Sequence, residues 1–160
     1  MEEQEAVWRK GVIAASVVVA STVLGVVVAH ATPSSGSTSV VIGRGVVGEE
    51  VKVNADPIKV TSKGPFEVIA QTVTFQPGGT SGWHSHPGPV FVVVKSGTVT
   101  VYDSTCVPRR YSAGEGFIEG PEPAVIRNEG ETVSENVATL LVPSGSPPRM
   151  DASSPCPGNV

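Results

Sequence analysis

The sequence predicts a small all-β domain, and three observations support this prediction. Valine is abundant, and the chain contains 18 glycines and 14 prolines, whereas aromatic residues make up only 5%. Valine favours strands, while glycine and proline favour the turns between them. The apolar segments are short, and several of them alternate apolar with polar residues, which is the period of a half-buried strand.

Strands are expected at regular intervals from residue 40 onward. Four short apolar segments, 40–42, 46–47, 51–53 and 58–60, are separated by glycines and by Asp56-Pro57. A longer alternating strand is expected over 66–76, further strands over 90–94 and 98–102, and a closing strand over 137–142. Several short strands at such spacing are typical of a sandwich or a barrel.

The rest of the chain divides around this barrel, which we place at residues 40–142. Residues 32–39 are small and polar and are expected to form a flexible linker. Residues 143–160 are rich in proline and serine and are expected to form an irregular tail.

An N-terminal apolar helix is expected within residues 1–31. Residues 11–29 contain no charge, and their length of about 19 residues is sufficient to span a bilayer. Arg9 and Lys10 precede this stretch and would keep the N-terminus in the cytoplasm. Ala29-His30-Ala31 resembles a signal-peptidase site, so the segment is either a retained membrane anchor or a cleaved signal. Both alternatives place the domain outside the cytoplasm, either anchored to the membrane or secreted.

Charge and cysteine content limit the alternatives further. The formal net charge is −4, and no basic patch interleaved with aromatic residues predicts nucleic-acid binding. Cys106 and Cys156 are the only cysteines, and in an exported chain they permit an intramolecular disulfide. Two free thiols, or an intermolecular bridge, remain the alternatives.

The most informative stretch runs from residue 78 to residue 102. His84 and His86 are two positions apart, so on a strand both imidazoles would lie on one face. Neutral imidazole is a ligand for zinc, iron, copper and nickel. The only other histidine is His30, in the N-terminal segment, so any third protein ligand from this domain must be a carboxylate.

The same stretch resembles the first motif of the cupin family, a small jelly-roll-like β-barrel. Gly78, His84, His86 and Gly97 match that motif, and its glutamate position falls on Val90. Residues 113–130 resemble the second motif, whose histidine position falls on Ala124. The resemblance covers roughly residues 60–142, and it implies pairing into a homodimer.

Glu122 is the carboxylate that the sequence favours as a third metal ligand. It lies two residues before Ala124, so on a regular strand the two side chains share a face. Glu115 and Glu119 are expected at turns, as solvated carboxylates. With His84 and His86, Glu122 would suit a divalent ion such as Fe, Mn, Ni, Cu or Zn.

Two functions follow from these residues. The first is a module that binds or senses a small molecule, with weak or no metal binding, because Val90 and Ala124 replace two family ligands. The alternative is a metal-dependent cupin enzyme, such as a dioxygenase or isomerase, that uses the two histidines with a carboxylate. In either case the ligand pocket is expected to include four residues near the histidines: Trp83, Val90, Tyr102 and Ala124.

Overall fold

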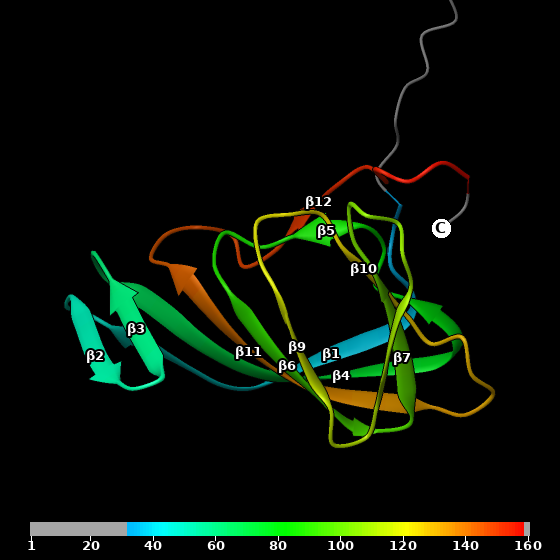
Figure 1. The fold of residues 1–160 in the computed structure, drawn as a ribbon, viewed down its shortest axis with the longest axis horizontal. Helices are drawn as coiled ribbons and strands as arrows, with labels where there is room; N and C mark the ends of the chain where they lie inside the picture. Colours follow the sequence, from blue (N-terminus) through cyan, green and yellow to red (C-terminus); the bar gives the residue numbers. More distant parts are fainter. Residues whose placement is uncertain (1–31, 159–160) are drawn as a thin grey trace, which may run out of the picture.

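Antiparallel strands wrap into a nearly closed barrel in the computed structural model, which describes residues 32–158 (Figure 1). These residues contain no helix and twelve strands: β1 (Ser35–Val47), β2 (Val51–Ala55), β3 (Ile58–Ser62), β4 (Phe66–Thr80), β5 (His84–Ser85), β6 (Val90–Ser96), β7 (Thr98–Tyr102), β8 (Arg109–Ser112), β9 (Gly116–Glu119), β10 (Val125–Arg127), β11 (Ser134–Pro143) and β12 (Met150–Asp151). The all-β prediction is therefore confirmed. The expected N-terminal helix lies outside the described residues. Within 32–158, no helix has the length and apolarity needed to cross a bilayer.

The main sheet has the order β8-β7-β10-β4-β11-β6-β9, and β1 pairs along the free side of β4. Two small sheets, β2-β3 and β5-β12, complete the fold. The hairpin β2-β3 projects away from the barrel, whereas β5-β12 lies across one end of it (Figure 1).

Alternation of side chains builds the core. Along β11 every second residue from Ser134 to Val142 is buried, and β6 buries Val90, Val92 and Val94. The apolar ones among them, Ala138, Leu140 and Val142 of β11 and the three valines of β6, belong to one apolar cluster with Phe75 and other side chains of the neighbouring strands. At about 25 cal/mol per Å² of buried apolar surface, this interior is the main source of stability of a barrel without helices.

The linker predicted for residues 32–39 is wrong from Ser35 onward. β1 begins at Ser35 and continues to Val47, pairing with β4 from Thr80 back to Phe66. It also joins the two segments that were expected as separate strands, with a register shift between Val41 and Gly43. Backbone hydrogen bonds to a long partner strand do not depend on apolar side chains, so composition gave no indication of this pairing.

An irregular tail was predicted for residues 143–160, and its described part, up to residue 158, is largely irregular but is not free. Met150 and Asp151 form β12, which pairs with the histidine strand β5. Cys156 forms the predicted disulfide with Cys106, with 5.6 Å between the two Cα atoms. The tail is therefore held against the end of the barrel that carries the histidines.

Candidate metal centre

The backbone fixes the two histidines from both sides. His84 exchanges two backbone hydrogen bonds with Ala124, at 2.9 and 2.8 Å, and the amide of His86 donates to the carbonyl of Gly120 at 2.9 Å. On the other side, β5 pairs with β12. Both side chains are buried, with exposed fractions of 4% for His84 and 6% for His86. Both imidazoles therefore lie in the interior of the domain.

Hydrogen bonds to carbonyl groups orient both imidazoles. Nδ1 of His84 lies 2.9 Å from the carbonyl oxygen of Gly82, and Nδ1 of His86 lies 2.7 Å from that of Pro148. A carbonyl oxygen only accepts hydrogen bonds, so each Nδ1 carries the proton and each Nε2 keeps its lone pair. A protein-bound Nδ1–H is the arrangement that usually supports a metal-ligating histidine.

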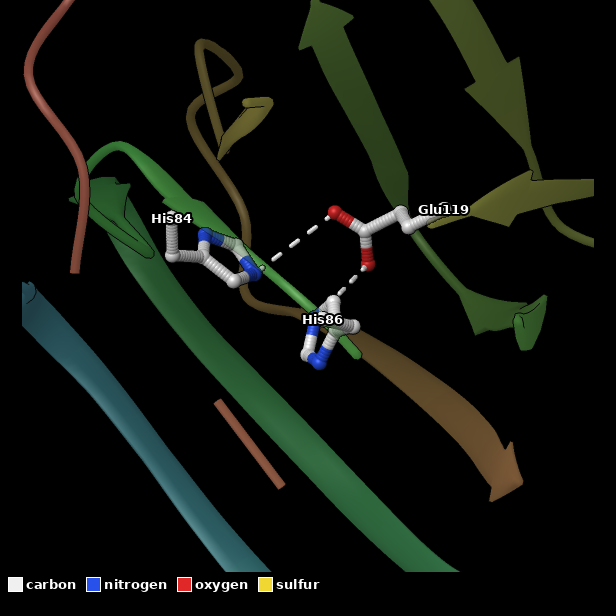
Figure 2. A group of neighbouring side chains, drawn as sticks. All are labelled: His84, His86 and Glu119. Carbon is white, nitrogen blue, oxygen red and sulfur yellow. Dashed lines mark ion pairs between the residues drawn. The ribbon is translucent and has the colours of Figure 1, made fainter. Parts of the chain in front are cut away.

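The carboxylate beside the histidines is Glu119. Its Oε1 lies 3.6 Å from Nε2 of His84, and its Oε2 lies 3.9 Å from Nε2 of His86. Figure 2 shows the two rings and the carboxylate directed toward one another. One ligand atom from each residue fits within a mutual distance of 4.8 Å.

Strand pairing explains why Glu119 reaches this point. It is the last residue of β9, and the register of β9 on β6 places it directly opposite Val90. Side chains directly opposite on paired strands have their Cβ atoms about 5 Å apart. Val90 occupies the family's glutamate position, so the carboxylate missing there is supplied by the neighbouring strand.

The expectations for the glutamates therefore need correction. Glu122 is exposed and does not belong to this cluster, because it lies in the bend between β9 and β10 instead of on a strand. Glu119 was expected at a solvated turn, yet its exposed fraction is 8%. Its position after the alternating residues Phe117 and Ile118 was the available signal, since Phe117 and Glu119 share the inward face of a strand.

Burial makes all three groups neutral over part of the physiological range. Burial lowers the pKa of His84 to about 3, with the positive charge of Arg149 as the next cause. The pKa of His86 is also lowered, mainly by burial. Burial raises the pKa of Glu119 to about 7, against the opposing effect of Arg149. The histidines are thus ready to act as neutral ligands, and Glu119 holds a proton that a cation would displace.

A cavity of about 380 Å³ opens beside the three residues. Of the four predicted pocket residues, Val90 lines it. Ala124 lines a neighbouring hollow on the other side of Glu119. Trp83 is fully buried in a second apolar cluster with Val125 and Cys156, and Tyr102 packs on that cluster and donates a hydrogen bond from its hydroxyl to Glu129.

The donor set fits a divalent metal ion. Oε1 of Glu119 is buried and has no hydrogen-bond partner among residues 32–158. Leaving a buried carboxylate oxygen without a partner costs free energy unless a cation or a donor satisfies it. Ligand atoms around an ion with bonds of ~2.1 Å lie about 3.0 to 3.4 Å apart, so only small side-chain shifts are needed. Two imidazoles and one carboxylate with open positions are typical of non-haem iron sites and related divalent centres.

Comparisons with known proteins agree with this fold. Residues 71–135 match the profile of the cupin domain family. This match supports the resemblance to the cupin family seen in the sequence. The comparison with curated proteins found no match.

Solved structures to which the chain is similar include a polyketide cyclase, an oxalate oxidase and a DMSP lyase. The polyketide cyclase RemF from Streptomyces resistomycificus is 11% identical, with 76% of this chain and 74% of that chain covered and a TM-score of 0.53. An oxalate oxidase is 28% identical over 45% of this chain and 40% of its own, with a TM-score of 0.42. DMSP lyase DddQ from Ruegeria pomeroyi is 15% identical over 52% and 42%, with a TM-score of 0.46. The chain thus spans about two fifths of the oxalate oxidase that it matches.

Proposed function

We propose that this cupin domain holds a divalent transition metal on His84, His86 and Glu119 and acts on a small molecule in the adjacent cavity. The observation that supports this most directly is the buried Oε1 of Glu119, which faces Nε2 of His84 and has no hydrogen-bond partner within residues 32–158. The sequence favoured a binding module with weak or no metal. A carboxylate directly opposite Val90 supports the enzyme alternative instead, because it supplies the third ligand.

The chain's own groups would do three things in such a reaction. The two histidines hold their ring orientation through Gly82 and Pro148, so the lone pairs on Nε2 stay directed into the site. Glu119 balances one positive charge and gives up its proton when the site fills. The apolar residues of the cavity wall, among them Val92 and Leu140, limit water around the bound molecule. The ion itself would supply Lewis-acid polarisation of a substrate oxygen.

A metal titration tests this proposal. We expect Fe(II), Mn(II), Ni(II), Cu(II) or Zn(II) to bind with micromolar or tighter affinity, measured by calorimetry and by quenching of the tryptophan emission. The double change His84→Ala, His86→Ala should abolish binding, and Glu119→Gln should weaken it. Glu122→Gln is the matched control, because Glu122 is exposed and outside the cluster. An untreated domain that binds none of these ions would refute the metal site.

The second candidate is a ligand-binding or sensing module without chemistry. Val90 and Ala124 in place of two family ligands favour it, because fewer protein ligands hold an ion less tightly. A metal-loaded chain that binds small molecules without converting any of them would support this candidate over the enzyme.

We also propose that the domain works outside the cytoplasm, anchored by residues 11–29 or secreted. The Cys106–Cys156 disulfide supports this, because such bonds persist in oxidising compartments. Sequencing the mature N-terminus distinguishes the two forms, since a start at Thr32 means cleavage. Pairing into a homodimer stays a prediction, which light scattering of the purified protein would test.

A further inference from the structure

The C-terminal tail places one positive charge beside the three candidate ligands. Arg149 is the only lysine or arginine among the described residues that line the 380 Å³ cavity. It lies close enough to affect the pKa values of Glu119 and both histidines. The side chain is about one-third exposed, so it reaches both the cavity and its mouth.

Arg149 is held in place but keeps hydrogen-bonding capacity. Its Nη2 donates to the carbonyl of Ser81 at 2.8 Å and to Oδ1 of Asp151 at 3.0 Å, and its Nε donates to the same oxygen at 3.2 Å. None of these three hydrogen bonds uses Nη1. Asp151 is mostly exposed, so solvent screens its charge and leaves Arg149 able to attract an anion.

The segment that carries Arg149 is fixed at several points. Pro148 accepts the hydrogen bond from His86, Met150 and Asp151 pair with β5, and the amide of Ala152 donates to Trp83 at 3.0 Å. The disulfide at Cys156 fixes the tail further along. An arginine on such a segment needs little ordering when a ligand binds.

Asn136, like Oε1 of Glu119, is a buried polar group of the same cavity that has no hydrogen-bond partner among the described residues. It lies in the middle of β11, between Val73 of β4 and Val94 of β6, and its exposed fraction is 1%. Neither Nδ2 nor Oδ1 has a hydrogen-bond partner within the described chain. A buried amide that lines a cavity and lacks both partners offers one donor site and one acceptor site to a ligand.

Most of the remaining cavity wall is apolar or uncharged. Phe75, Val92 and Leu140 line it together with several serines and Gln71. A space of this size admits a molecule of a few to about a dozen non-hydrogen atoms. Arg149, with its charge, and Asn136, with its unpaired amide, are therefore the residues that we expect to select the small molecule.

We propose that the cavity binds a small organic acid, with its carboxylate on Arg149 and a second polar group, such as a hydroxyl, on Asn136. This inference rests on the proposed metal site, because the acid would share the cavity with the ion. Arginine suits the carboxylate, since its planar guanidinium forms charge-assisted hydrogen bonds to two oxygens.

Calorimetry on the full chain in mild detergent tests the proposal in two stages. Ni(II) is titrated first, because it binds imidazole strongly and is redox-inert under these conditions. Lactate, lactamide and propionate are then titrated into the Ni(II)-loaded chain. Lactate should bind best, because lactamide lacks the negative charge and propionate lacks the hydroxyl.

Three variants separate the roles. Arg149→Gln should weaken lactate binding about ten- to a hundredfold, because one or two charge-assisted hydrogen bonds are lost, and Arg149→Lys should weaken it less. Asn136→Leu should remove the preference for lactate over propionate without lowering the melting temperature, since the amide has no hydrogen-bond partner in the described part of the chain. Arg110→Gln, which changes an exposed arginine on β8, is the matched control and should bind as the unchanged chain does.

The outcomes distinguish the two proposals. A chain that binds neither Ni(II) nor any of the other four ions overturns the metal site, and the organic-acid inference falls with it. A chain that binds Ni(II) but takes lactamide as well as lactate, or is unaffected by Arg149→Gln, overturns the organic-acid inference alone. Full Ni(II) affinity in Arg149→Gln together with weakened lactate binding supports both.

Discussion

Replacing Glu119 with glutamine should change how the stability of the metal-free domain depends on pH. The pKa of this carboxyl is 4.5 in a model compound and about 7 in the fold, because burial disfavours its charged form. A raised pKa means that the folded state binds a proton more tightly than the unfolded state. The contribution of the protonated Glu119 to the free energy of unfolding is therefore complete below pH 4.5 and is lost as the pH rises through 7.

Linkage gives the size of the effect. Between pH 5 and pH 8, this one group should lower the free energy of unfolding by about 2 to 3 kcal/mol. Glutamine cannot ionise, so Glu119→Gln loses this term while keeping a side chain of similar size. The contributions of His84 and His86 are present in both proteins and cancel to first order in the comparison.

Urea unfolding with chelator present measures the difference. The chain from Thr32 to Val160 contains every described strand, and its single tryptophan, Trp83, is fully buried and reports unfolding. We expect the unfolding free energy of Glu119→Gln to rise relative to the unchanged domain by about 2 to 3 kcal/mol from pH 5 to pH 8. Glu122→Gln should show no such trend, because that carboxylate is exposed.

Adding metal at pH 8 should offset much of this difference in stability. An ion at a hundred times its dissociation constant stabilises the folded state by about 2.7 kcal/mol, and the glutamine variant should gain less. Parallel stability curves for Glu119→Gln and the unchanged domain between pH 5 and pH 8 would refute the reasoning, because they would mean that Glu119 ionises as if it were exposed.

Three further predictions follow from the same structure. Metal affinity should rise about tenfold per pH unit up to pH 7 and then level off, because Glu119 must lose its proton while His84, with a pKa of about 3, is already neutral; a flat profile in calorimetry from pH 5.5 to 8 would contradict this. Replacing Cys106 and Cys156 with alanine opens a loop of 50 residues and should lower the unfolding free energy by roughly 4 kcal/mol; urea midpoints equal to those of the bridged protein would be inconsistent with it. Trp83→Phe should lower the free energy of unfolding by about 1 to 3 kcal/mol and leave the metal affinity unchanged, because Trp83 packs in the second cluster and not in the cavity. Loss of metal binding in this variant would contradict that placement.

Local features of the sequence were sufficient for the fold and for part of the site. The spacing of His84 and His86 determines that both rings share a face, because side chains alternate along a strand. Gly97 has a φ of +73°, and a Cβ there would come within 2.9 Å of the backbone of Ser134, so this motif position needs glycine for a local reason. The disulfide was expected from two cysteines in a chain that the sequence predicts to be exported, and the structure confirms that pairing.

The third ligand and the mouth of the cavity depend on tertiary structure. Glu119 is a candidate ligand only because β9 pairs with β6 in the register that places it opposite Val90, and a shift by one residue would turn its side chain outward. The pairing of β12 with β5 places Arg149 and Pro148 beside the histidines. The two paired segments are more than 60 positions apart in the sequence. Strand order and register are set by contacts between distant segments, so no local pattern around Glu119, Asn136 or Arg149 could have shown that they share one cavity.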